Sequence, residues 1–456
     1  MTTDEAPARG DEAATPQADQ AATSQAARAA VHPEPDDGDA QDHPGGSLWR
    51  NRSYRLLLTG STAEVVGAGI GAFAVPLVAY QITGSVVQAG LIAFVGQLGS
   101  VLVSIPAGVV VDRVDRRRLI MVATFVAAMA WLTVVGAGLA GALTAPHLAA
   151  VLFVSSVAGA LLDPADNASV HAVVRTEQLG QAMSVQQGRE AAATLIAGPL
   201  GGLLFGMGTV LPFLVSALGR LTSTVTASLV REPLNGDLAS ARAEHPLDGL
   251  KDGLRFVWAV PLFRMVLPVF VLVNINLNGM MSAVMLELVR TGTPPVKIGL
   301  LGTAVGIGVL AGSILAAPLI QRVRVGALTV LTLGMGGAAT LVMAVLHSYG
   351  GYVGALAALM LFAPALNAGL ISYLTAITPG SMQGRMAATL GLTGVVAGPL
   401  APLVGSQLLE HAGIEVALWI ASAVWAVLAV ALLFIKPLWR IGLPSTWADD
   451  VIAWPR

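Results

Sequence analysis

Glu64 and Arg220 are ionisable residues that lie deep inside long apolar stretches of this sequence. Each lies about ten residues into its stretch, which corresponds to about 15 Å along a helix and to the middle of a bilayer's hydrocarbon core. A charge at that depth is costly unless it is paired or hydrated, so both residues are functional candidates. We expect them to share one membrane depth and to form an ion pair or a proton relay. The alternatives are a purely structural partner for Glu64 and an Arg220 that reaches outward to the interface.

Further polar side chains interrupt other apolar stretches. Asp163 and Asp166 flank a proline, where they either line an inner vestibule or cap a helix end. Asn274 and Asn278 are four residues apart and therefore share one helix face. Side-chain amides at such positions either bind a substrate or hold helices together, and the sequence leaves both open. The full set of candidates for proton coupling or a substrate cavity is Glu64, Arg220, Asp163, Asp166, Asn167, Asn274, Asn278 and Asn367.

The composition indicates a membrane protein. Of the 456 residues, 55% are hydrophobic and 11% are charged, whereas a soluble protein carries about 25% charged residues. The chain has no cysteine, which excludes disulfides and cysteine-ligated metals. Its seven histidines form no ligand cluster, and it has no nucleotide-binding loop or catalytic triad. We therefore expect a protein that is not an enzyme and that holds neither a cofactor nor a metal.

From Tyr54 onward, apolar runs of about the 20 residues needed to cross a bilayer follow one another. A helix satisfies its own backbone hydrogen bonds in hydrocarbon, so each run predicts a helix. The sequence thus predicts an all-α membrane protein of twelve transmembrane helices in two groups of six. Their approximate bounds are 54–80, 88–111, 119–141, 147–170, 184–207, 210–230, 263–289, 298–320, 325–347, 351–377, 386–409 and 414–435.

Basic residues concentrate in alternate loops, which indicates the cytoplasmic side of the membrane. The opposite loops hold only Arg290 and Lys297. Both termini are therefore expected in the cytoplasm, and the chain is expected in the inner membrane. Residues 1–47 hold ten of the 27 acidic residues and almost no large apolar residue, so they predict a disordered acidic tail.

Internal repeats divide the chain into two pseudo-symmetric halves. The segment 197–200 recurs at 397–400, and 164–168 recurs at 364–368 with one difference. Parallel repeats of this kind are related by an axis along the membrane normal and hold a substrate site between them near mid-membrane. The predicted segments are the cytosolic tail 1–47, the N-terminal six-helix half 48–230, a cytosolic linker 231–262 with a short amphipathic helix, the C-terminal six-helix half 263–440 and a cytosolic C-terminal tail 441–456.

The loop between the second and third predicted helices has the pattern Gly-x3-Asp-Arg-x2-Arg-Arg within residues 108–118. This pattern resembles the signature loop of the major facilitator superfamily. Thr-Gly-Ser at 83–85 and Gly-Pro at 198–199 are similar to motifs of one branch of this superfamily, which includes the enterobactin exporters and macrolide-efflux-type permeases. The resemblance covers about residues 48–440. It implies the major facilitator fold and a loop that latches the two halves together on the cytoplasmic side. The residues of this latch would be Gly108, Asp112, Arg113, Asp115, Arg116 and Arg117.

The latch motif departs from the family pattern at one position. Asp115 stands where the family usually has a second glycine, and its charge could form a further latch contact or weaken the existing one. The alternative is that the arginines serve only as topology signals.

Glycine–proline pairs occur at matching places in the two halves. Small residues recur every four positions after Gly198, which lets one helix face pack closely. The proline removes a backbone donor and permits a bend. The resemblance implies that this element is tied to outward transport, and plain tight packing is the alternative. The residues concerned are Gly198, Pro199, Gly202, Gly398 and Pro399.

These features predict a secondary active transporter that works by alternating access. The resemblance implies a proton-coupled exporter of a small amphipathic molecule, such as a drug, an antibiotic or a siderophore, with a cavity lined by predicted helices one, four, seven and ten. Drug–proton antiporters of the superfamily often carry an arginine in helix four, where this chain has Ser155, so Glu64 is the better candidate to carry the proton.

Other functions and partners follow from the same features. The alternatives are an importer or facilitator of a small metabolite, and a membrane scaffold or sensor that does not transport. The expected partners are a small-molecule substrate, protons and membrane lipids. No nucleic-acid partner is expected, and we expect a monomer.

The latch interpretation predicts that the two halves differ. The echo of the loop in the second half, residues 321–324, lacks both aspartates. Asp112→Asn should therefore shift the resting conformation and slow transport, whereas Arg322→Ala should have a much smaller effect. Initial transport rates of the purified variants in proteoliposomes check this, and equal effects of the two substitutions would contradict the latch.

Overall fold

The computed structural model describes residues 47–235, 255, 258–259, 261–444 and 446–447. The chain divides into two units, Met1–Ser47 and Leu48–Arg456, and the helices below belong to the second unit. The disordered tail expected at the N-terminus and the amphipathic helix expected in the linker lie outside the described residues.

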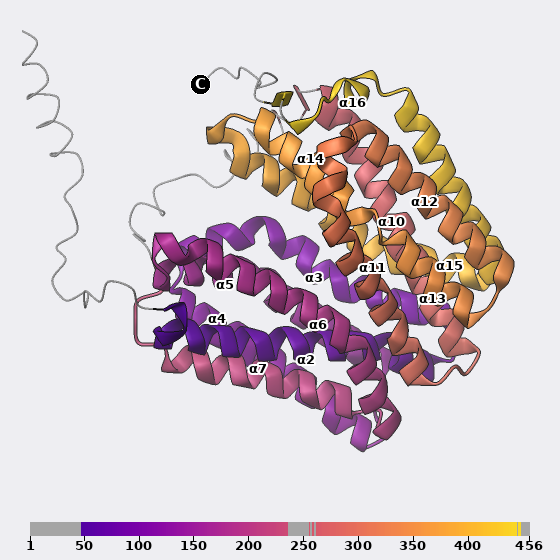
Figure 1. Cartoon of the computed structure of the whole chain (residues 1–456). Helices are drawn as coiled ribbons and strands as arrows, with labels where there is room; N and C mark the ends of the chain where they lie inside the picture. The colour runs from indigo at the N-terminus through magenta and orange to yellow at the C-terminus, as the bar shows by residue number, and fades with distance from the viewer. Residues whose placement is uncertain (1–46, 236–254, 256–257, 260, 445, 448–456) are drawn as a thin grey trace, which may run out of the picture. The chain divides into compact units, whose positions relative to one another are not determined.

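The described residues form helices and contain no strand, which confirms the all-α prediction. We use "N-terminal half" for α2–α7 and "C-terminal half" for α10–α16, and Figure 1 shows them as two groups. The first group holds η1 (Leu48–Arg50), α2 (Arg52–Thr83), α3 (Val86–Arg113), α4 (Arg116–Leu139), α5 (Ala145–Val173), η2 (Thr176–Gln178), α6 (Leu179–Met207) and α7 (Leu211–Leu229). The second holds α10 (Pro261–Arg290), α11 (Pro295–Arg322), α12 (Val325–Leu346), α13 (Tyr349–Leu359), α14 (Ala363–Ile377), α15 (Gly380–Leu433) and α16 (Lys436–Arg440).

Ten helices in the described part of the chain are long and apolar enough to cross a membrane. The longest of them, α15, has 54 residues and includes Gly413, whose φ of 77° is not helical. A straight helix of that length would span about 80 Å, more than twice the hydrocarbon core. The 19-residue α7 is not among the ten. Dividing α15 at Gly413 and counting α7 gives the expected number of twelve.

The tenth predicted helix, 351–377, is divided into α13 and α14. Pro364 lies in the first turn of α14, where a proline is favoured because its missing N–H has no helical partner. The equivalent residue of the first half, Pro164, lies inside α5, which continues through it. The same residue type at equivalent repeat positions therefore breaks one helix and not the other.

The C-terminal half also extends beyond residue 440, where the sequence placed the start of a tail. Ile441 and Trp447 are 1% and 7% exposed, and both belong to the core of this half. The ring of Trp447 meets that of Tyr373 edge-on, with centroids 5.6 Å apart. Burial of large apolar side chains is favourable, which accounts for the longer C-terminal half.

Short polar residues and glycines mark the ends of the helices. The side chains of Asn51, Ser85 and Asp115 accept hydrogen bonds from the first turns of α2, α3 and α4. Such N-caps satisfy backbone donors that have no partner inside the helix. Gly84 ends α2 with a φ of 64°, a conformation that glycine adopts without strain. These caps turn the chain sharply between crossings.

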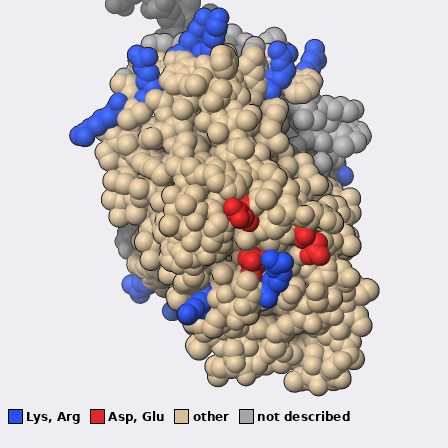
Figure 2. All heavy atoms as spheres, turned by 90° about the vertical axis from the view of Figure 1, so that its right-hand side faces the viewer, with Lys and Arg blue, Asp and Glu red and all other residues tan. Residues whose placement is uncertain are grey.

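Apolar side chains pack within each half and also cover its outside. In the N-terminal half, Trp131 stacks on Phe213 with ring centroids 5.1 Å apart. Leu102, Ile314 and Phe434 are more than half exposed, as residues in contact with lipid would be. Figure 2 shows a face on which Lys and Arg gather along the upper edge, and a band of uncharged residues separates them from a small group of charged residues lower on the face. Such an uncharged band suits the hydrocarbon core of a membrane.

The two halves meet through glycines on two pairs of helices. A Cβ on Gly299 of α11 would overlap the carbonyl oxygen of Gly198 on α6, and one on Gly202 would lie 2.5 Å from the carbonyl oxygen of Pro295. On the second pair, a Cβ on Gly90 of α3 would lie 2.9 Å from the carbonyl oxygen of Pro402 on α15. Larger residues at these positions would push the halves apart. Figure 1 shows α6 and α11 side by side at the boundary.

The α6–α11 contact predicts a specific cross-link, because the chain has no cysteine of its own. A Cβ on Gly306 would lie 3.7 Å from Leu195 Cα, which is within reach of a disulfide. We expect the variant Leu195→Cys with Gly306→Cys to cross-link under mild oxidation and to lose transport until it is reduced. Electrophoresis after cleavage in the linker detects the bond. Each single substitution is the control, and a pair that stays unlinked would contradict this arrangement of the halves.

Candidate functional site

A cavity of about 570 Å³ lies between the two halves. Helices α2, α3, α5, α10 and α11 line most of it, and α4, α6, α7, α13 and α15 contribute one residue each. Small residues such as Ala68 and Ala72 leave the space open on the N-terminal side. A cavity of this size suits a drug-sized molecule, since such sites measure about 300–1,000 Å³.

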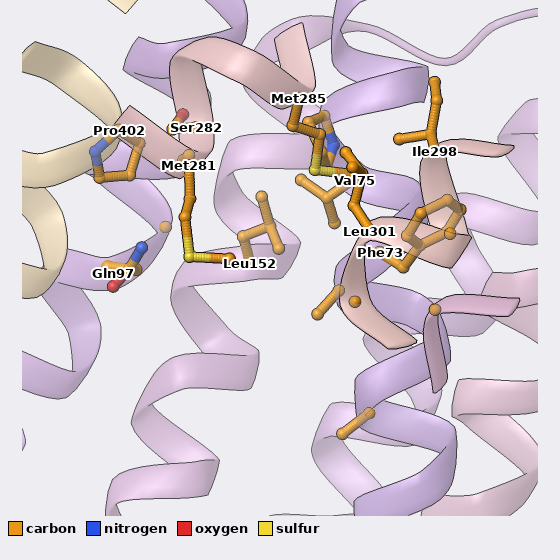
Figure 3. Close-up of a pocket in the computed structure, with 18 of the residues that line it drawn as sticks. Phe73, Val75, Gln97, Leu152, Met281, Ser282, Met285, Ile298, Leu301 and Pro402 are labelled. Carbon is orange, nitrogen blue, oxygen red and sulfur yellow. The ribbon is translucent and has the colours of Figure 1, made fainter. Parts of the chain in front are cut away.

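The wall of the cavity is mainly apolar. Figure 3 shows Met281 extending toward Leu152, and Met285 beside Val75. Methionine side chains are flexible and polarizable, so they adapt to ligands of different shape. The apolar side chains that line the cavity include Phe73, Val75, Leu152, Met281, Met285, Ile298, Leu301 and Leu356. A ligand therefore gains most of its contact here with apolar surface.

Glu64 and Arg220 form an ion pair at this cavity. Arg220 Nη1 lies 3.0 Å from Glu64 Oε1, and the side chains of Arg220 and Glu64 are 6% and 16% exposed. Helices α2 and α7 approach closely at this level, because a Cβ on Gly219 would overlap the carbonyl oxygen of Ala63. Arg220 and Glu64 follow these two residues in the sequence, so the close approach brings their side chains within reach. Of the pair, Arg220 lines the cavity.

Buried polar atoms around the cavity have no hydrogen-bond partner among the described residues. They are Trp131 Nε1, Ser155 Oγ and Arg220 Nε. A buried polar group without a partner costs about 1–3 kcal/mol, so a molecule or water that supplied acceptors would be favoured here. Gln97 adds an amide to the same wall. The cavity thus combines an apolar surface with a few polar groups.

The other acidic candidates lie elsewhere in the N-terminal half. Asp166 lines a separate small cavity with Ser61 and Arg189. Asn167 Nδ2 donates to the backbone oxygen of Asp163 at 3.0 Å, and Asn167 Oδ1 accepts from Gln186 at 3.1 Å. The structure therefore does not place Asp163, Asp166 or Asn167 on the main cavity.

The asparagines of the C-terminal half also lie away from the main cavity. Asn274 and Asn367 line a second cavity of about 140 Å³ within this half. Asn278 is exposed and donates to the backbone oxygen of Asn274 at 2.9 Å. Asn276, which lies between them, donates to the backbone oxygen of Ala421 on α15 at 3.1 Å and so joins two helices.

Several cavity residues were not among the sequence candidates. Gln97 could have been found as an uncharged polar residue inside an apolar stretch, and Ser155 was considered only as a missing arginine. Met281 and Met285 carry no signal that separates them from other core methionines. Predicted helices one, four and seven line the cavity, whereas helix ten contributes only Leu356 and the second and eighth helices contribute several residues. The rotation of each helix decides this, and the sequence does not give it.

The candidate latch loop is bound to the end of α7. Arg116 Nη1 donates to the backbone oxygen of Leu234 at 3.0 Å, and Arg117 donates to that of Ser228. Asp115 Oδ1 accepts from the backbone N–H of Arg118 at 2.9 Å and so caps α4. The side chain of Asp112 lies outside the described residues, and Arg113 is partly buried.

The two ends of this loop have different surroundings. No described atom lies within 4 Å of a Cβ placed on Gly108, so no neighbouring helix packs against this glycine in this conformation. Near the other end, Glu232 accepts a hydrogen bond from Ser53. This bond lowers the pKa of Glu232 and ties the segment that follows α7 to the start of α2.

A family model described as Major Facilitator Superfamily matches residues 57–292 and 275–448. This chain belongs to the major facilitator superfamily. It is therefore a multi-pass membrane protein of a class that transports small molecules and does not comprise enzymes.

Relatives and solved structures agree with this membership. The multidrug efflux pump Tap of Mycolicibacterium fortuitum is 28% identical over 403 residues, which cover 86% of this chain and 97% of that protein. Macrolide efflux protein A of Streptococcus pyogenes is 22% identical over 59% of this chain and 66% of its own length. Among solved structures, a bacterial homologue of the iron transporter ferroportin in an inward-facing state has a TM-score of 0.67 at 17% identity, covering 85% of this chain and 99% of that chain. The nucleoside transporter NupG has a TM-score of 0.65 at 12% identity, covering 86% and 100%.

The buried ion pair predicts non-additive effects of substitution. Glu64→Gln leaves the charge of Arg220 buried without its partner, and loss of one member of a buried pair typically costs about 3–5 kcal/mol. Arg220→Gln should be destabilising for the same reason. The double variant should be more stable than the sum of the two losses allows, because it carries no unpaired charge. Thermal unfolding of the detergent-purified proteins measures this, and strictly additive losses would show that the pair contributes no coupling.

Proposed function

We propose that this chain exports small amphipathic molecules of the drug class across the bacterial inner membrane in exchange for protons. The observation that carries the proposal is the cavity between the halves, which joins a mainly apolar wall, with Met281 and Met285 in it, to the Glu64–Arg220 ion pair. The relatives named as a multidrug efflux pump and a macrolide efflux protein support the substrate class and the direction of transport. These relatives give no support to siderophore export.

The cavity and the ion pair suit a coupled exchange. Transfer of an apolar molecule from water to the wall of the cavity is favourable by about 25 cal/mol per Å² of buried apolar surface. Protonation of Glu64 would leave Arg220 without its counter-charge and would change the electrostatic field at the cavity wall. Binding of a proton and binding of a substrate are therefore linked through Arg220, and such linkage is reciprocal.

Alternating access fits the contacts between the halves. The glycine contacts of α6 with α11 lie near the ends of these helices that are opposite the basic loops. If the basic loops face the cytoplasm, with both termini on that side, the halves meet on the outer side and the cavity opens inward. In the outward-open conformation, the loop from Gly108 to Arg117 would then hold the halves together on the cytoplasmic side. It does not hold them together in the inward-open conformation described here. We propose a monomer that needs only its substrate, protons and lipids.

Transport by everted membrane vesicles tests this function. Respiring vesicles acidify their lumen, so an exporter should accumulate radiolabelled erythromycin, a macrolide, and should release protons from the lumen when erythromycin is added. An importer would instead lose preloaded erythromycin on energisation. A membrane protein that does not transport would show neither effect.

A bulky substitution in the cavity wall tests whether the substrate binds in this cavity. Ala72 lies on the cavity wall next to open space, so Ala72→Trp should block accumulation of erythromycin almost completely. Leu341 on α12 is 38% exposed and does not line the cavity, and Leu341→Trp is the control that should keep transport. Equal transport by both variants would contradict the assignment of this cavity to the substrate.

A further inference from the structure

A second polar site lies in the N-terminal half, between α2, α5 and α6. It is a cavity of about 20 Å³, and its polar lining comes from Tyr54, Ser61, Asp166, Gln186 and Arg189. It shares no lining residue with the large cavity between the halves. The site is thus separate from the surface that we assign to the substrate.

This small cavity has the size and chemistry of a site for one buried water. A polar cavity of at least about 10–15 Å³ can hold a water molecule that makes two to four hydrogen bonds. Tyr54 Oη and Arg189 Nε are buried there and have no hydrogen-bond partner in the described part of the chain. A water between them and the Asp166 carboxylate would satisfy both groups.

The site lies one helical turn from Glu64 along α2. Arg189 donates a hydrogen bond from Nη1 to Ser61 Oγ. Ser61 precedes Glu64 by three residues, so both lie on one face of α2. Asp166 interacts electrostatically with Glu64, Arg189 and Asp163.

In the other direction the site reaches the exposed end of the helices. Gln186 donates to Asn167 Oδ1 at 3.1 Å and to Glu190 Oε1 at 3.4 Å, and both of these residues are exposed. Polar groups therefore run from the ion pair at the large cavity to the end of the N-terminal half that carries Arg52 and Arg55. The concentration of basic residues assigns this end to the cytoplasm.

The charges around Asp166 favour a bound proton. The charged groups that face it are Glu64 from α2, Asp163 from α5 itself and Arg189 from α6. Two further charged residues contact these groups. Arg220 of α7 pairs with Glu64, and Glu190 lies 3.7 Å from Arg189.

The neighbouring helices do not change this balance. Helix α3 carries no charge before Asp112, and α4 carries none after Arg118. Glu64, Asp163 and Asp166 thus outnumber Arg189 and Arg220 by one. Binding of one proton removes this excess negative charge.

We propose that Asp166 and a water in the small cavity relay protons between Glu64 and the cytoplasmic face, along a route that the substrate does not enter. In the first step the Glu64 carboxyl gives its proton through the water to the Asp166 carboxylate, so that Glu64 becomes charged and pairs with Arg220 again. In the second step protonated Asp166 gives the proton to water at the cytoplasmic face. Arg189 stabilises the charged form of Asp166 between deliveries, which prepares it to accept the next proton.

The inference rests on the proposed proton-coupled export, and two assays on the full-length protein in proteoliposomes separate them. Counterflow of radiolabelled erythromycin at equal pH on both sides needs substrate exchange but no net proton transfer. Uptake driven by a pH gradient needs both. Asp166→Asn should keep counterflow and should lower gradient-driven uptake by about 100-fold, the usual effect of losing one positioned proton-transfer group.

A second variant and a control isolate the role of the water. Tyr54→Phe removes only the hydroxyl that has no partner, and it should lower gradient-driven uptake while counterflow persists. Glu177→Gln removes an exposed carboxylate on η2, between α5 and α6, and should change neither assay. Retained counterflow also shows that a variant is folded.

The outcomes distinguish the two proposals. Wild-type uptake driven by the gradient, together with equal uptake by Asp166→Asn, would overturn the relay and leave proton-coupled export standing. Loss of both activities in Asp166→Asn and in Tyr54→Phe would show that these residues support the fold, and it would also overturn the relay. A wild-type protein that shows counterflow but does not respond to the gradient would refute proton coupling itself, and the absence of both activities would refute export of this substrate class.

Discussion

The ion pair between Glu64 and Arg220 is the interaction on which the rest of the structure depends. Two charges in an apolar bundle are tolerated only when they lie within direct reach of each other, and here 3.0 Å separates them. The pair lies where α2 and α7 approach almost backbone to backbone, which glycines at 60, 67 and 219 allow. The pair therefore ties together two closely packed helices and holds one cation at the wall of the large cavity.

The duplication of the chain determines how the halves meet. Helices α6 and α11 form one contact and α3 and α15 form the other, and the repeats relate α6 to the first segment of α15 and α3 to α11. The two contacts are equivalent, so both need glycines that let the helix backbones approach closely. Glycines of α6 and α11 do this at one contact and a glycine of α3 does it at the other. The cavity lies where these contacts leave the helices apart.

Much of the fold was predictable because hydropathy, loop charge and helical rise all give the position of a residue along the membrane normal. Hydropathy gives the crossings, basic loops suggest their direction, and the helical rise placed Glu64 and Arg220 at one depth before the structure showed them in contact. The sequence does not give the rotation of each helix about its axis or its neighbours across the bundle. For that reason the asparagines of α10 were grouped with the cavity although they face other partners, and Gln97 and Met281 were missed. The break before Pro364 was missed because local packing decides whether a proline interrupts a helix.

The two halves differ in where they hold charge. In the described helices of the C-terminal half, ionisable residues lie near the helix ends or beside Gly413, while Glu64, Asp166, Arg189 and Arg220 occupy the interior of the N-terminal half. The methionines of α10 and the apolar residues of α11 line the cavity without titrating. The wall supplied by the second half can therefore change shape without altering the charged groups held in the first half.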